Sequence, residues 1–210
     1  MGFKINDMKA IKIPFLISIL CNDLLIPFII FAVVKKGNTY NIQQAVMMLT
    51  QMFTPFLGAF CVYMHLAKYI DTKGNEIYFV YRRNKWKEVV SLCVLYIISN
   101  TCFFLWYVSL NKKFITEWLH IVIMCVVFCM AAYCFSFAFQ SISLAIIPCF
   151  LYTMLSISGF NPLFQKISYY EGNVMSMQNL WGKYHYFLLA TFIFATVGNR
   201  LNKHYCHYNE

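Results

Sequence analysis

The chain alternates between long apolar stretches and shorter polar connections. Stretches without Asp, Glu, Lys or Arg cover residues 45–67 and 89–110, and a longer one covers residues 118–160. About 20 apolar residues in a helix, rising 1.5 Å per residue, are enough to cross the roughly 30 Å hydrocarbon core of a bilayer. Because these runs are continuously apolar, they favour helices over strands, whose apolar residues alternate. The pattern predicts membrane-spanning helices.

The stretch 118–160 is too long for a single span. As one helix it would be about 65 Å long, twice the thickness of the hydrocarbon core. The polar sequence Gln140-Ser141-Ile142-Ser143 is the predicted break between two helices. With weaker candidates at both ends of the chain, we expect an all-α integral membrane protein with six transmembrane helices. The predicted spans are residues 13–34, 45–67, 89–110, 118–139, 141–160 and 184–199.

Composition excludes a soluble enzyme. Of 210 residues, 60% are hydrophobic and 12% are charged, whereas soluble domains carry about 25% charged residues. We therefore expect residues 1–210 to form a single transmembrane domain, with no room for a soluble catalytic domain. Eight of the nine cysteines lie in apolar stretches, where thiols pack as small hydrophobic groups and do not predict a disulfide framework.

The net charge of +9 indicates topology and does not indicate a nucleic-acid partner, because basic residues stay on the cytoplasmic side of membrane proteins. With the N-terminus inside, 11 of the 17 Lys and Arg residues lie on the inner side and 6 on the outer side. This bias predicts a multi-pass protein of the plasma membrane with both termini in the cytoplasm.

The inner loop, residues 68–88, contains a predicted short amphipathic helix. After the turn signal Gly74 come an N-cap residue, an acid suited to a first turn, three apolar residues on one face and two arginines suited to a helix C-terminus. These residues are Asn75, Glu76, Ile77, Val80, Tyr81, Arg82 and Arg83. Two interpretations stay open: the helix docks a partner protein, or it rests on anionic lipid.

The outer segment, residues 161–183, mixes apolar residues with Pro162, Glu171 and Gly172. Phe164 and its apolar neighbours can cover one side of a short helix, but the polar break at Glu171 and Gly172 cannot lie unsatisfied in lipid. We expect a broken, re-entrant segment that dips partly into the membrane between spans five and six. The alternative is a solvated loop, although unstructured loops of this length are uncommon.

This arrangement resembles the membrane subunit of an export-type ABC transporter, the type-two permease group that includes drug, polysaccharide and bacteriocin-immunity exporters. In that family, the loop between spans two and three carries an acid, a Gly and a coupling helix, followed by a basic stretch. Asp71, Gly74, Glu76 and residues 82–87 match this pattern. The family also places a re-entrant segment between spans five and six, where residues 161–183 lie.

The resemblance implies a bacterial permease subunit of an exporter, which forms the substrate pathway and is not itself an enzyme. Its partners would be a separate ABC ATPase subunit, a second copy or a related permease, and the lipid bilayer. ATP and Mg would bind to the ATPase, because Gly182-Lys183 is not part of a phosphate-binding Walker A loop. This chain is expected to bind no cofactor or metal. The implied substrate is a peptide, a bacteriocin or an amphipathic compound.

Two alternatives remain. A membrane-embedded cysteine peptidase could use Cys125 or Cys129, which share a helix face, with His65 or His120. However, no thiol has an evident cationic activator beside it in the sequence. The chain could also be an accessory membrane component without an ATPase. In the C-terminal tail, His204, Cys206 and His207 are three potential zinc ligands without a fourth.

Asp23 is the candidate functional residue within the spans. A carboxylate inside an apolar helix is costly, so its presence suggests a functional role. Two structural interpretations stay open beside it: the span is shifted so that Asp23 is hydrated, or Asp23 is hydrogen-bonded to Asn22 or Asn100.

Overall fold

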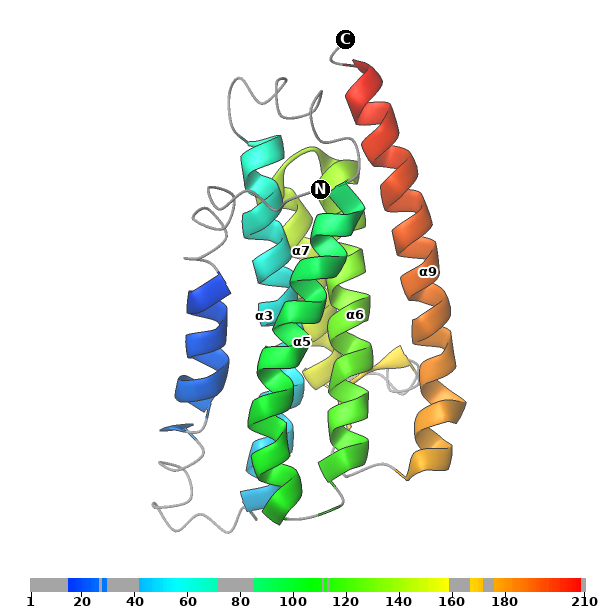
Figure 1. Cartoon of the computed structure of the whole chain (residues 1–210). Helices are drawn as coiled ribbons and strands as arrows, with labels where there is room; N and C mark the ends of the chain where they lie inside the picture. Colours follow the sequence, from blue (N-terminus) through cyan, green and yellow to red (C-terminus); the bar gives the residue numbers. More distant parts are fainter. Residues whose placement is uncertain are drawn as a thin grey trace.

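The computed structural model describes residues 15–26, 28–29, 42–71, 85–110, 112, 114–158, 167–171 and 176–208. Within these residues the regular structure is entirely helical, which confirms the predicted all-α class. The helical elements are η1 (Cys21–Leu25), α3 (Ile42–Ile70), α5 (Lys85–Leu110), α6 (Phe114–Phe139), α7 (Ile142–Ser158) and α9 (Met177–Tyr208) (Figure 1).

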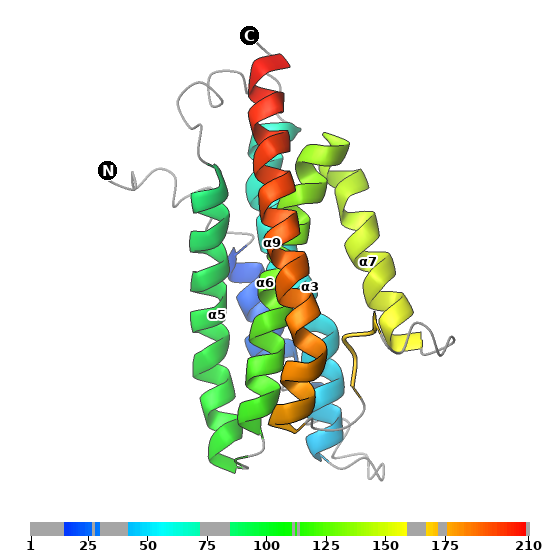
Figure 2. The same cartoon turned by 90° about the vertical axis from the view of Figure 1, so that its right-hand side faces the viewer.

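Helix α6 is the centre of the bundle. It packs against α3, α5, α7 and α9. Its share of apolar residues is higher than that of the helices around it, because other helices cover nearly all of its faces. Figure 2 shows α5 and α7 on opposite sides of α6, with α9 running along it. The first helix, which contains η1, packs against α3 and α5.

The predicted break between the fourth and fifth helices is confirmed. Helix α6 ends at Phe139 and α7 begins at Ile142. Between them Gln140 has a φ of 51°, a left-handed conformation that interrupts the right-handed helix. The Ile142 N–H donates to Asp71 Oδ1 at 3.4 Å, so the end of α3 helps to satisfy a free donor at the start of α7.

Helix α9 is longer than the predicted span 184–199. It begins at Met177, so residues 177–183 belong to a helix and not to the loop portion of the outer segment. Ser176 explains this start, because its hydroxyl accepts a hydrogen bond from the Asn179 N–H at 3.3 Å. This is the N-cap geometry that satisfies a free donor of the first turn.

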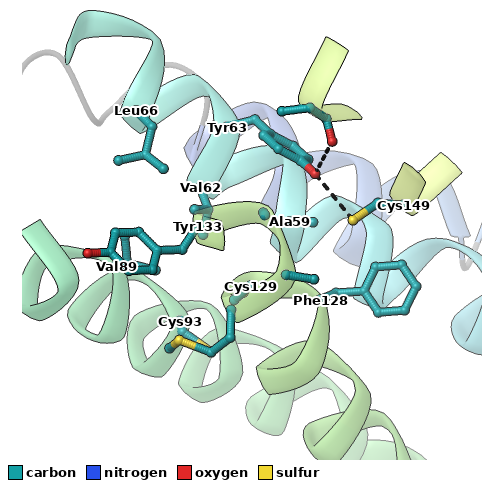
Figure 3. Close-up of a cluster of buried hydrophobic side chains, with 14 of the residues drawn as sticks. Ala59, Val62, Tyr63, Leu66, Val89, Cys93, Phe128, Cys129, Tyr133 and Cys149 are labelled. Atoms are coloured by element: carbon teal, nitrogen blue, oxygen red, sulfur yellow. Dashed lines mark hydrogen bonds between the residues drawn. The ribbon is translucent and has the colours of Figure 1, made fainter. Parts of the chain in front are cut away.

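Small and aromatic side chains build the core (Figure 3). Ala59 and Val62 of α3 and Cys129 of α6 are fully buried. Tyr63 of α3 reaches α7, where its hydroxyl donates to the Ala145 carbonyl at 2.6 Å and lies 3.2 Å from Cys149 Sγ. Buried tyrosines usually find such a partner for the hydroxyl.

The outward faces of the bundle are apolar, whereas many polar residues are buried. Large exposed apolar side chains occur on every helix: Leu20, Phe28, Met48, Leu95, Ile98, Ile115, Ile147, Leu151, Leu189 and Phe192 are examples. Two of the described helices contain segments long and apolar enough to cross a membrane, Met47–Ile70 in α3 and Ile115–Phe139 in α6. Phe15–Leu24 and Ile142–Ser158 are shorter apolar helices.

Candidate functional site

Only part of the predicted site lies within the described residues. The coupling-helix residues Asn75, Glu76, Ile77, Val80, Tyr81, Arg82 and Arg83 fall outside them, as do Pro162, Phe164 and Gly172. Asp23 and Glu171 are described, and each belongs to a different cluster of polar side chains inside the bundle.

The first cluster lies at η1, where the first helix meets α3 and α5. Asn22 is almost fully buried, and its amide nitrogen donates to Asn100 Oδ1 of α5 and to Asp23 Oδ1, the latter at 3.1 Å. Its amide oxygen accepts from Thr54 Oγ1 of α3 at 2.7 Å. Asn22 therefore joins three helices. The π-helical turn positions it there, and single π turns are frequent at functional sites.

Asp23 lies at the edge of this cluster. Its two carboxylate oxygens face Asn22 at 3.1 Å and Ser99 Oγ at 3.4 Å. The side chain is half-buried. Asp23 is therefore hydrogen-bonded to Asn22, one of the two partners expected from the sequence. The side chain of the other expected partner, Asn100, bonds to Asn22 and to the carbonyl of Tyr96.

We predict that Asn22→Leu destabilises the fold more than Asp23→Asn. The leucine leaves the buried Thr54 and Asn100 groups without their partner, at a cost of about 1–3 kcal/mol. The asparagine at position 23 keeps an oxygen that can accept from Asn22. The thermal unfolding midpoint in mild detergent measures both effects. Equal midpoints for Asn22→Leu and the wild type would contradict the assignment of Asn22 as the link between the three helices.

The second cluster, which we call the outer network, lies at the predicted outer end of the bundle. Gln51 of α3 and Glu117 of α6 are almost fully buried, and Gln51 Nε2 donates to Glu117 Oε1 at 2.7 Å. His120 Nδ1 lies 3.5 Å from the same carboxylate oxygen. Its Nε2 lies 2.8 Å from the hydroxyl of Tyr184 in α9. These side chains connect α3, α6 and α9.

The backbone of residues 167–171, which belong to the outer segment, is held by side chains of the surrounding helices. Tyr152 of α7 donates to the Ile167 carbonyl at 2.7 Å, and Tyr184 donates to the Tyr169 carbonyl at 3.0 Å. The Glu171 N–H donates to Gln51 Oε1 at 2.9 Å. Tyr169 itself is fully buried. Three polar backbone groups of the segment therefore have side-chain partners on the surrounding helices.

Glu171 also forms an ion pair with Lys183 in the first turns of α9. Both side chains are partly exposed, so the ion pair lies at the rim of the outer network. Sequence analysis singled out Glu171, and considered His120 only as a partner of a catalytic thiol, but missed Gln51, Glu117, Tyr169 and Tyr184. One sequence feature could have identified Gln51, Glu117 and His120: each is a polar residue within or beside an apolar stretch.

A third cluster lies at the predicted cytoplasmic end. Glu88 Oε2 accepts from His65 Nε2 at 2.8 Å and from the Tyr69 hydroxyl at 2.7 Å. Burial acts to raise the pKa of Glu88, but these two hydrogen bonds and the charges of His65 and Lys68 outweigh it and lower that pKa to about 2. The Lys85 ammonium lies 4.9 Å from the centre of the Tyr69 ring, within cation–π range.

The peptidase alternative gains no support from the geometry. Cys125 and Cys129 are buried at the centre of the bundle, whereas a nucleophilic thiol must reach its substrate. His65 pairs with Glu88 and His120 with Tyr184. Among the described side chains, no group of three His, Cys, Asp or Glu residues is placed to hold a metal ion. The side chains of His204, Cys206 and His207 lie outside that description.

An apolar cavity of about 330 Å³ lies beside the outer segment. Residues of α6, α7 and α9 line it, among them Phe128, Pro148 and Phe194, and Ile167 closes one side. With this lining, the cavity can accept an apolar group but offers it almost no hydrogen bonds.

No protein-family model matches the chain, and no curated protein or solved structure matches it. The resemblance to export-type permeases therefore rests on the topology and loop placement read from this chain.

Proposed function

We propose that this chain is the permease subunit of an ABC exporter, embedded in the plasma membrane with six spans and both termini in the cytoplasm. The membrane placement is supported by the distribution of polarity. Apolar side chains cover the outward faces, and Asn22, Gln51, Glu117 and His120 lie inside. A soluble bundle would be unfavourable, because large exposed apolar patches lead to association. In lipid the same faces are solvated, and polar residues turn inward.

The observation that carries the permease proposal is the course of residues 167–171. They lie between α7 and α9, the fifth and sixth predicted spans, and their backbone is bonded to side chains of α3, α7 and α9. Export-type permeases, which the sequence pattern of this chain resembles, are expected to have a re-entrant segment at this place. The apolar cavity beside it suits the apolar part of a peptide or amphipathic substrate.

In this proposal, a second copy or a related permease completes the pathway, and the predicted coupling helix contacts a separate ATPase. ATP binding and hydrolysis by that partner supply the energy, while this chain contributes the path and the mechanical connection. The polar clusters at the two ends of the bundle then hold the helices together as they move.

We predict that the coupling-helix residues determine ATPase binding. Ile77→Asp, Tyr81→Ala and the double variant Arg82→Glu/Arg83→Glu should each reduce recovery of the ATPase by about tenfold or more, as expected for central residues of an interface. The measurement is copurification of an ABC ATPase with the tagged chain in mild detergent, followed by identification of the partner by mass spectrometry.

The matched control is Lys112→Glu/Lys113→Glu, which makes the same charge change at the predicted outer end. It should leave ATPase recovery unchanged. If no ABC ATPase copurifies with the wild-type chain, the permease proposal fails. If an ATPase copurifies equally with all the variants, the assignment of the coupling helix is wrong.

A further inference from the structure

A groove of about 400 Å³ runs between α5 and α9, with α6 as its floor. Figure 1 shows α6 between α5 and α9. Phe192 and Ala195 of α9 form one wall, Trp86 and Val90 of α5 form the other, and Tyr133 of α6 lies at the base. Phe192 is 70% exposed beside the groove, so the groove opens onto the apolar outer surface.

The end of this groove nearest to Trp86 is cationic. Thr196 and Asn199 line the groove on α9, and the residues four positions further along the same face are Arg200 and Lys203. Both of these cations are exposed. On α5, Lys87 is exposed as well, and its ammonium lies 5.9 Å from the centre of the Trp86 ring.

The acidic residue in the described first turn of α5 does not neutralise the positive charges at the groove. Glu88 is the acidic residue of that turn, and its carboxylate accepts hydrogen bonds from His65 and Tyr69 of α3. The groove therefore combines an apolar wall with three cations at one end. That end is the predicted cytoplasmic side, where the lipid surface is negatively charged.

We infer that this groove is a binding site for an anionic phospholipid of the inner leaflet. The phosphate contacts Lys87, Arg200 and Lys203, and an acyl chain lies along Phe192 and Ala195. Trp86 lies at the level of the headgroup, the depth at which tryptophan is enriched in membrane proteins. Basic pockets between spans on the cytoplasmic side bind anionic headgroups through the same chemistry. The inference rests on the membrane placement in the proposed function, and not on the identity of the transported substrate.

The test is titration of the purified full-length chain in mild detergent with phosphatidylglycerol or phosphatidylcholine, with bound lipid counted by native mass spectrometry. We expect the wild type to prefer phosphatidylglycerol. The triple variant Lys87→Gln/Arg200→Gln/Lys203→Gln should lose this preference, at about fivefold in affinity for each charge removed. Ala195→Leu fills the groove and should weaken binding of both lipids.

Two control variants match these changes. Lys36→Gln/Lys112→Gln/Lys113→Gln removes three positive charges at the predicted outer side, and Ala138→Leu adds the same volume at an exposed alanine of α6 that does not line the groove. Both should bind phosphatidylglycerol as the wild type does. Soluble glycerol phosphate, which has the charge without the acyl chains, should not bind at comparable concentrations.

Equal binding of the two lipids by the wild type would overturn the inference, as would unchanged preference in the triple variant. Binding of glycerol phosphate as tight as that of the lipid, with no effect of Ala195→Leu, would also overturn it, because the groove would then play no part. ATPase copurification is a separate measurement, so the lipid site can fail while the permease proposal holds. Recovery of the chain in the soluble fraction without detergent would instead refute the membrane placement.

Discussion

Replacing Gly198 with leucine should destabilise the bundle by about 3 kcal/mol, the upper range for overpacking a filled core. Gly198 of α9 is buried against α6. A Cβ atom at this position would be 2.6 Å from Tyr133 Cδ1 and 3.2 Å from the Cα atom of Cys134. Tyr133 is fully buried and packs edge-to-face on Phe137 with ring centroids 5.3 Å apart, so moving its ring to admit a larger side chain would break this packing.

The same helix supplies the matched control. A Cβ atom at Gly182 would meet nothing within 4 Å, so Gly182→Leu should be neutral or stabilising by up to about 1 kcal/mol through helix propensity. Thermal unfolding in mild detergent, followed by circular dichroism, measures both variants. For a chain of this length, 3 kcal/mol corresponds to a fall of about 6–12 °C in the midpoint. A Gly198→Leu midpoint equal to that of Gly182→Leu would disprove the close contact.

The apolar stretches predicted much of the helical core, because a buried or lipid-facing helix must be apolar over most of its length. Helices α3 and α5 each cover one of these stretches, and α6 and α7 divide the stretch 118–160 between them. The break at Gln140 could be predicted because a single helix over residues 118–160 would have been too long for any bilayer. That these helices cross a membrane with the predicted orientation stays a prediction.

The start of α9 could not be predicted from hydropathy. Gly182 and Lys183 lower the apolar character of its first turns, yet the helix continues through them because Ser176 caps it and Tyr184 is anchored in the bundle. A search for N-cap residues upstream of the apolar stretch would have found Ser176.

The hydrogen-bond partners within the outer network could not be predicted from the sequence, for a different reason. Gln51 and Glu117 are 66 residues apart, and the Glu171 N–H reaches Gln51 across 120 residues. Periodicity places a residue on a face of its own helix, but it does not say which face of another helix lies opposite. The same limit applies to the bond between Asn22 and Asn100, because the sequence suggested each of them only as a partner of Asp23.

Glu117→Leu should also cost about 3 kcal/mol, the upper end of the range for a buried donor that loses its acceptor. The Glu117 side chain is 1% exposed, and its Oε1 accepts from Gln51 Nε2 at 2.7 Å while facing His120 Nδ1 at 3.5 Å. Leucine would leave the buried Gln51 amide without this acceptor, which costs about 1–3 kcal/mol, and it would remove the carboxylate that faces His120. Glu117→Gln is the matched control, because its amide oxygen can still accept from Gln51, and we expect a cost below about 1 kcal/mol.

The double variant Gln51→Leu/Glu117→Leu separates the hydrogen bond from the burial. Replacing both partners by apolar groups removes the unsatisfied donor together with its acceptor, so the double variant should be less destabilised than the sum of the two single variants. Additive losses would show that Gln51 and Glu117 do not interact.

A second measurement links this cluster to the outer segment. Gln51 Oε1 accepts the Glu171 N–H at 2.9 Å, so Gln51 is held in place by Glu117 on one side and holds residues 167–171 on the other. Glu117→Leu should therefore speed hydrogen exchange of the Glu171 amide, whereas Glu117→Gln should leave it slow. Local opening of this kind precedes global unfolding in weakly held segments. If both variants exchange at the wild-type rate, the outer segment is anchored by Tyr152 and Tyr184 alone, and the outer network does not position it.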